Sequence, residues 1–217
     1  MDKKNLLEGK KVFLIDPDDK KENDKTFCFW AQEEDEIYRE YKKIISTSWG
    51  NIRINNESAQ PIFPLRYYHI NSIDLYNYSR EIISKYDITC FKGLVKSIQE
   101  KVVLTVRLRS QDYTTRYIFD SRPPKLKQQK KREFYISQSF YGVKIELQEH
   151  VFEDNVYRMM DFRVSQSSAT QFVYILPYNA KTALVELTRF GKNVLQIDEA
   201  EKILNQFIKE NFGTYKI

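Results

Sequence analysis

The fold is decided by residues Phe134 to Thr188, FYISQSFYGVKIELQEHVFEDNVYRMMDFRVSQSSATQFVYILPYNAKTALVELT. Several segments here have the alternating or continuously apolar pattern of β-strands. They are Phe140 to Leu147, Met159 to Val164, Gln171 to Leu176 and Ala183 to Thr188. Because no helical pattern separates these strands, we expect them to pair antiparallel in one sheet.

Two acids, Asp161 and Glu186, lie within these otherwise apolar or aromatic strands. A two-residue period puts Glu186 on one face with Leu184 and Thr188. A carboxyl group that faces an apolar cavity has its charged form disfavoured, and full burial raises its pKa by about 3 to 5 units. Such a group keeps its proton at neutral pH. From the pattern alone, a solvent-facing acid on a half-exposed strand is the simpler interpretation of Glu186.

The composition is that of a globular protein, with 41% hydrophobic and 14% aromatic residues in a chain of 217. One domain or two interwoven lobes are expected at this length. Cys28 and Cys90 form no CxxC pair, which favours buried thiols in a reducing compartment. His69 and His150 lack the spacing of metal ligands, so no metal site is expected.

The charge balance, 35 basic against 30 acidic residues, gives a net charge of only +5. The densest basic run, Lys125 to Arg132, contains no aromatic residues that could stack on bases, so no nucleic-acid partner is expected. This run fits a solvated linker or a contact with anionic lipid. Apolar runs such as Phe172 to Leu176 are far shorter than the roughly 20 residues of a membrane-spanning helix, so any membrane association should be peripheral.

The N-terminal part begins with a short apolar run, Lys11 to Asp16, which predicts a buried parallel strand. An acid at the carboxyl end of such a strand binds ribose hydroxyls in dinucleotide folds, although loop-initiating aspartates are also common. The glycine-rich turn that normally precedes such a strand is not found in these 217 residues. We expect the first strand, its glycine loop and most of the first helix to be missing.

Further along, the spacing of apolar residues between Leu75 and Tyr86 predicts a helix with Asp74 as its N-cap. Strands are predicted at Ile88 to Phe91, Val102 to Leu108 and Arg116 to Phe119. A second helix, with Asp198 and Glu201 in its first turns, should end just before Gly213.

Four segments carry a resemblance to a known family. Asn23 to Trp30, NDKTFCFW, looks like the N-D-R-T-W-x-F-W segment of bacterial lycopene cyclases, and Leu184 to Thr188, LVELT, like their F-L-E-E-T motif. MMDFRVSQ, from Met159, and FDSRPP, from Phe119, also match family segments. The chain therefore resembles the lycopene cyclase family over nearly all of its length, with Lys25, Phe27 and Leu187 departing from the family pattern.

The resemblance implies an α/β (α+β) chain, a partial FAD-binding flavoprotein fold with an antiparallel substrate-domain sheet. Residues 1–124 would form an incomplete FAD-binding region, and residues 125–217 the substrate-binding sheet with a C-terminal helix. Glu186 would be the catalytic acid, and Asp161 a second acid or an orienting partner. The residues implied for FAD are Asp16, Lys25, Thr26, Trp30, Asp120, Ser121 and Arg122.

The activity implied is cyclisation of the linear ends of lycopene to β-ionone rings, with FAD reduced by NAD(P)H. The substrate would be a membrane-dissolved carotenoid, met by a cytoplasmic enzyme peripheral to the inner membrane. Five aromatic residues are candidates to line a polyene tunnel, although most of them are expected simply to pack in the core: Phe140, Tyr141, Phe162, Phe172 and Tyr174. A related FAD-dependent monooxygenase or prenyl reductase, or an inactive carotenoid-binding fragment, remain alternatives.

Overall fold

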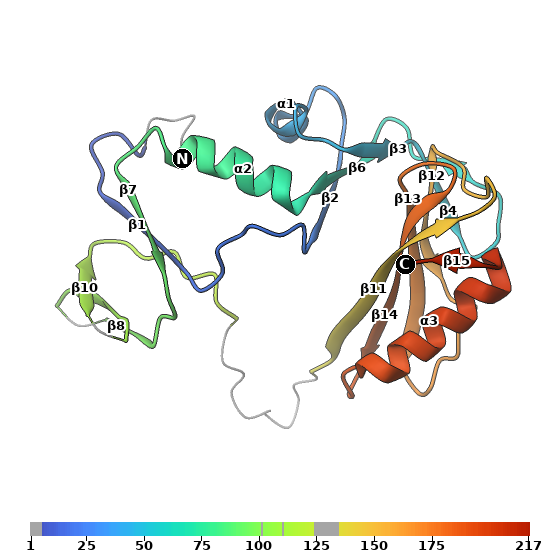
Figure 1. Cartoon of the computed structure of the whole chain (residues 1–217). Coiled ribbons are helices and arrows are strands. Elements are labelled where there is room, and N and C mark those ends of the chain that lie inside the picture. Colours follow the sequence, from blue (N-terminus) through green and yellow to red (C-terminus); the bar gives the residue numbers. More distant parts are fainter. Residues whose placement is uncertain (1–5, 101, 110, 124–134) are drawn as a thin grey trace. The chain divides into compact units, whose positions relative to one another are not determined.

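The computed structural model describes residues 6–100, 102–109, 111–123 and 135–217 (Figure 1). The basic run Lys125 to Arg132 lies outside these residues. The chain forms two compact units, each built from two separate stretches. Unit 1 contains Met1–Phe27 and Ile70–Leu126, and unit 2 contains Cys28–His69 and Lys127–Ile217. Residues 28–69, which the sequence grouped with the N-terminal region, therefore belong with the C-terminal sheet.

Unit 1 contains the predicted parallel strand, β1 (Val12–Asp16), paired with β7 (Ile88–Lys92). The expected burial of β1 is wrong, because Phe13 and Leu14 are nearly half exposed. The ladder has only two strands and therefore covers its apolar side chains only in part. Phe13 packs against Tyr113 of a distant segment, at 5.4 Å between ring centroids.

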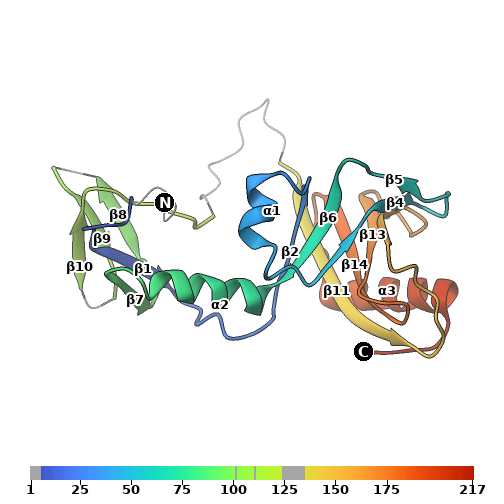
Figure 2. The same ribbon diagram turned by 90° about the horizontal axis from the view of Figure 1, so that it is seen from above.

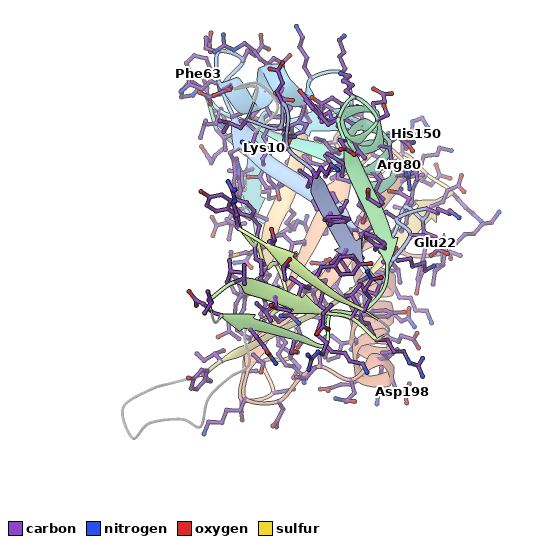
Figure 3. The ribbon with its side chains drawn as sticks, turned by 90° about the vertical axis from the view of Figure 1, so that its left-hand side faces the viewer. Lys10, Glu22, Phe63, Arg80, His150 and Asp198 are labelled. Atoms are coloured by element: carbon purple, nitrogen blue, oxygen red, sulfur yellow. The ribbon has the colours of Figure 1, made fainter. Side chains whose placement is uncertain are left out.

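The helix of unit 1, α2 (Ser72–Ile83), begins three residues before the predicted Leu75, with Asn71 and not Asp74 as the N-cap. The Asp74 carboxylate instead accepts a hydrogen bond from Asn71 Nδ2 at 2.9 Å. Near the other end of α2, Arg80 (Figure 3) donates to the carbonyl oxygen of Asp19 at 3.1 Å. The helix thus holds the loop that follows β1.

Unit 1 also has an antiparallel three-stranded sheet of β8 (Ser97–Glu100), β9 (Leu104–Arg107) and β10 (Asp112–Thr115). The strand predicted at Arg116 to Phe119 is not formed. The Thr115 hydroxyl donates to the carbonyl of Tyr117 at 3.1 Å, which turns the chain at the end of β10. Apolar residues in this segment remain exposed, so there is no buried face to stabilise a strand.

Unit 2 is built on a seven-stranded sheet with the strand order β15-β11-β14-β13-β12-β4-β5. The four strands predicted from the sequence are its centre and pair antiparallel as expected. Beyond them, β12 pairs in parallel with β4 from the N-terminal third of the chain. The strands are β4 (Asn51–Ile54), β5 (Gln60–Pro61), β11 (Ser137–Leu147), β12 (Val156–Asp161), β13 (Thr170–Pro177), β14 (Thr182–Gly191) and β15 (Tyr215–Lys216).

One face of this sheet is covered by α3 (Ile197–Phe212), which runs along β11 and β14 in Figure 2. Leu204 and Ile208 of the helix pack against fully buried Val185 and Leu187 of β14. The helix begins after the N-cap Gln196 and ends at Gly213, whose φ of 78° suits glycine. The predicted amphipathic helix is confirmed.

The opposite face carries a second core cluster, formed by Trp49, Tyr157 and Leu176. A three-stranded sheet supplies much of this layer, in the order β2 (Thr26–Ala31), β6 (Arg66–Asn71) and β3 (Thr47–Trp49). A short helix, α1 (Glu36–Tyr41), follows β2. None of the helices in the described ranges is long and apolar enough to cross a membrane.

Candidate functional site

Glu186 lies in the middle of β14, on the face of the sheet that α3 does not cover. Across the ladders it is directly opposite Gly142 of β11 and Tyr174 of β13. Leu184 and Thr188 share its face, as the two-residue period predicts, whereas the residues between them are buried under α3. The sequence therefore placed Glu186 on the correct face.

The surroundings of Glu186 favour its protonated form. The side chain is half-buried, and burial raises the pKa of its carboxyl group. The Thr188 hydroxyl donates to Glu186 Oε1 at 3.4 Å, and this weaker effect lowers the pKa. Within the described part of the chain, no lysine or arginine forms an ion pair with Glu186. A carboxyl group in this position can hold and release a proton.

The half-buried thiol of Cys28 lies close enough to Glu186 to be influenced by its charge. Burial raises the pKa of Cys28 to about 11, with a smaller contribution from Glu186. Burial also raises the pKa of Tyr178 to about 12, again with contributions from Cys28 and Glu186. The thiol and the phenol therefore stay neutral, so they place no charge beside the acid.

Trp30, an expected FAD contact, lies in an aromatic cluster of unit 2. Its ring stacks on Tyr67 at 4.5 Å between centroids, and its Nε1 donates to the hydroxyl of Tyr157 at 3.1 Å. Tyr67 in turn packs against Tyr157 at 4.6 Å. The sequence analysis missed Tyr67 and Tyr157, because their common environment depends on β6 and β12 being brought into one layer.

The expected tunnel aromatics are divided by the sheet. Tyr174 and Phe172 lie on the Glu186 side and pack edge to face at 5.1 Å, and Phe162 packs on Phe172 at 5.5 Å. Phe140, which is opposite Thr188, also lies on this side and is mostly exposed. Tyr141 does not join them, because strand alternation turns it under α3, where its hydroxyl donates to Glu201 Oε1 at 2.9 Å.

Asp161 also lies on the α3 side, because it is opposite buried Val173. Its side chain is fully buried and accepts hydrogen bonds from Arg158 at 2.7 Å and Arg163 at 2.6 Å. Burial alone would raise its pKa, but the bonds from Arg163 and the charge of Arg158 outweigh burial and hold the pKa below its usual value. The expectation that Asp161 keeps its proton is therefore wrong, and the structure does not bring it beside Glu186.

Three of the residues implied for FAD lie near the start of unit 1. Asp16 ends β1, where its Oδ1 accepts a hydrogen bond from the Asp18 backbone at 2.8 Å. The Lys25 ammonium pairs with Asp24 at 2.6 Å, which raises the pKa of Lys25, and Thr26 begins β2 with an exposed side chain. Ser72, which sequence analysis missed, accepts a hydrogen bond from the Lys25 backbone at 3.1 Å.

Asp120, Ser121 and Arg122 form an exposed irregular segment in the same unit. The Arg122 guanidinium binds both carboxylate oxygens of Asp120, at 2.8 and 2.9 Å. These bonds lower the pKa of Asp120 to about 2. Arg122 also donates to the carbonyl oxygen of Val95 at 3.0 Å, so its charge and donors are already engaged within the chain.

A shallow hollow of about 370 Å³ lies next to the carboxyl ends of β1 and β7. None of the residues implied for FAD lines it, although neighbours of Asp16 and Lys25 do. Its walls are Pro17, Asp18, Asp19, Glu22, Asp24 and Lys92. Carboxylates suit the hydroxyl groups of a ribose but repel a pyrophosphate. The described residues of this hollow therefore fit the ribose of FAD and do not fit its pyrophosphate.

The fold is shared with flavoproteins of known structure. The halogenase PltM in complex with phloroglucinol and FAD aligns with a TM-score of 0.52 at 10% identity, over 81% of this chain and 44% of that chain. PltM in complex with ethyl mercury and mercury aligns with a TM-score of 0.51 at 10% identity, over 81% and 43%. The predicted partial flavoprotein fold with an antiparallel sheet is confirmed. This chain spans less than half the length of these proteins.

Sequence comparison identifies the family. No curated protein sequence matches the chain. The family model described as lycopene cyclase protein, however, matches residues 4–215, nearly the whole chain. This match includes both units and all of the segments in which the resemblance was found. The chain belongs to the lycopene cyclase family.

Proposed function

We propose that this chain supplies the acid of a lycopene β-cyclase, and that Glu186 protonates a terminal double bond of linear lycopene. The observation that carries this proposal is the environment of Glu186. It is a half-buried carboxyl group with a raised pKa and without a cationic partner in the described residues, on a sheet face with several aromatic side chains.

The steps balance as an isomerisation. The Glu186 carboxyl group gives its proton to the terminal carbon–carbon double bond, which leaves a carbocation. An internal double bond attacks this cation and closes the six-membered ring. A neighbouring carbon then loses a proton, for which the Glu186 carboxylate produced in the first step is a base. The ring of Tyr174, directly opposite Glu186, would stabilise the intermediate cation through its quadrupole.

FAD, reduced by NAD(P)H, is proposed as the cofactor because of the family match and because one PltM structure contains FAD. When bound, a reduced flavin would supply an electron-rich ring to the site. The proposed contacts remain Asp16, Lys25, Thr26, Trp30, Asp120, Ser121 and Arg122, and no step above depends on the cofactor. We also propose a cytoplasmic location with peripheral contact to the inner membrane, where a carotenoid dissolves.

The test is Glu186→Gln, expressed in cells that accumulate lycopene. Loss of the acid should lower formation of cyclic carotenoid by about 10²- to 10⁴-fold, measured by chromatography of the pigments. Glu146→Gln is the matched control, because Glu146 lies on the same face of the sheet but is exposed, and it should retain activity. Cyclic carotenoid at the wild-type level in Glu186→Gln would refute the acid assignment.

The same cells distinguish the alternative reactions. Cyclisation leaves the mass of the pigment unchanged and consumes neither oxygen nor NADPH in proportion to product. A monooxygenase or a prenyl reductase would change the mass by oxygen or hydrogen and consume its co-substrate stoichiometrically. A carotenoid-binding fragment would retain lycopene on the purified protein while its spectrum stays that of the linear pigment.

A further inference from the structure

Gly142 is the one residue of β11 directly opposite Glu186. Its neighbours on the same face of the strand, Phe140 and Lys144, are both large. Glycine weakens a strand interior, because it adds backbone entropy to the unfolded chain and contributes no packing. A glycine in this place therefore needs a reason other than strand stability.

The distances across the ladder give that reason. A Cβ added to Gly142 would lie 3.2 Å from Glu186 Cβ, 3.3 Å from Glu186 Cγ and 3.3 Å from Leu184 Cδ1. Directly opposite residues normally have Cβ atoms about 4.5 to 5.5 Å apart. The Glu186 stem thus occupies space that a side chain at position 142 would need.

The direction of this stem also determines where the carboxyl group lies. With its first two side-chain carbons over Gly142, the carboxyl group is half-buried, within 3.4 Å of the Thr188 hydroxyl. The other titratable groups near it are Cys28 from β2, Tyr174 from β13 and Tyr178. Lys144, on the same strand as Gly142, lies with its ammonium 5.0 Å from the centre of the Tyr178 ring.

We propose that Gly142 is a positioning residue for Glu186, because the missing side chain lets the glutamate stem lie across β11 and hold its carboxyl group against the sheet. The inference rests on the proposed function in that Glu186 is taken as the acid. It adds a requirement for the strand facing that acid: any side chain at position 142 should lift the carboxyl group away from the sheet.

The experiment is a ¹³C NMR titration of the Glu186 carboxyl carbon in the full 217-residue chain, assigned with Glu186→Gln. In Gly142→Ala the displaced carboxyl group should be better hydrated, and its titration midpoint should fall towards the ordinary glutamate value of about 4.3. The matched control is Gly191→Ala, in the same strand as Glu186. There the added Cβ would also have a close contact, 3.1 Å from Ala169 Cβ, but it would not contact the acid, so the Glu186 midpoint should stay unchanged.

An unchanged Glu186 midpoint in Gly142→Ala, or an equal shift in Gly191→Ala, would overturn the proposal. If Gly142→Ala fails to fold, the exchange Gly142→Ala with Glu186→Gly should restore folding, because it moves the small residue to the other strand. If the double variant also fails to fold, the proposed role of Gly142 is refuted.

The pigment assay separates this inference from the proposed function. If Glu186→Gln keeps full activity, the acid assignment fails whatever the titration shows. If Glu186→Gln loses activity while the Glu186 midpoint in Gly142→Ala equals that of the wild type, only the role of Gly142 fails. If the acid assignment and the role of Gly142 are both correct, Gly142→Ala should reduce kcat more than it raises KM. The acid is then displaced while the aromatic residues stay in place.

Discussion

Asp161 and Glu186 lie two strands apart in one sheet, on opposite faces, and their surroundings differ mainly in cationic partners. Asp161, under α3, is enclosed by Arg158 and Arg163 and has a lowered pKa. Glu186, on the other face, is only half-buried and yet has a raised pKa. The more deeply buried acid is the ionised one. Pairing, not depth, therefore decides which of the two carboxyl groups can give a proton.

The largest expected effect is on the α3 side of this comparison. Asp161→Ala should lower the free energy of unfolding by about 3 to 5 kcal/mol, because it leaves two arginines, one of them mostly buried, without their carboxylate. Urea denaturation measures the loss. Asp154→Ala, in the exposed turn before β12, is the control and should unfold at the same urea concentration as the wild type. An equally small effect at Asp161 would mean that its ion pairs do not hold the sheet.

The free energy of unfolding should depend on pH in opposite directions at the two acids. For Glu186 the folded pKa exceeds the unfolded value of about 4.3, so the folded state binds the proton more tightly and the free energy of unfolding falls as pH rises from about 4 to the folded pKa. For Asp161 the folded pKa is below the unfolded value of about 3.9, so its contribution is lost as pH falls below about 4.

Urea denaturation between about pH 2 and pH 8 separates the two contributions. Glu186→Gln should flatten the profile only above about pH 4, and Asp161→Asn only below it. If Glu186→Gln leaves the upper part of the profile unchanged, burial does not raise the pKa of Glu186, and the contrast between the two faces disappears.

The smallest expected effect concerns the single hydrogen bond to Glu186. At 3.4 Å the contact from the Thr188 hydroxyl is longer than an ordinary O–H···O bond. It lowers the pKa of Glu186 by less than burial raises it. Thr188→Val should raise this pKa further and change the free energy of unfolding by about 1.5 kcal/mol or less. The NMR titration measures the shift, with Thr182→Val at the start of β14 as the control. A lowered pKa would contradict the hydrogen bond.

Sequence patterns predicted the centre of the sheet well, because strand alternation is a local property. They placed Glu186 with Leu184 and Thr188, and they located α3 from its apolar stripe and Gly213. They did not show that Asp161 is paired. The register between β12 and β13 shifts between Arg158 and Asp161, and this irregularity puts both side chains on the α3 face, against simple alternation.

The cofactor-side predictions depended on family motifs, and local geometry could not be read from them. The match of FDSRPP does not reveal that Arg122 closes onto Asp120. Nor does NDKTFCFW show that Trp30 packs with Tyr67 and Tyr157, which come from distant segments. Gly142 was missed for the same reason, since its importance appears only once the register of β11 and β14 is known.

The parallel pairing of β4 with β12 also limits how this protein can be divided genetically. Val156 pairs with Asn51, more than a hundred positions earlier, so residues 28–69 complete the sheet that contains Glu186. A gene cut near residue 125 would leave β12 with unpaired N–H and C=O groups and would uncover Tyr157, which is a surface prone to aggregation. A stable minimal fragment with the acid must therefore be assembled from two separate pieces of the coding sequence.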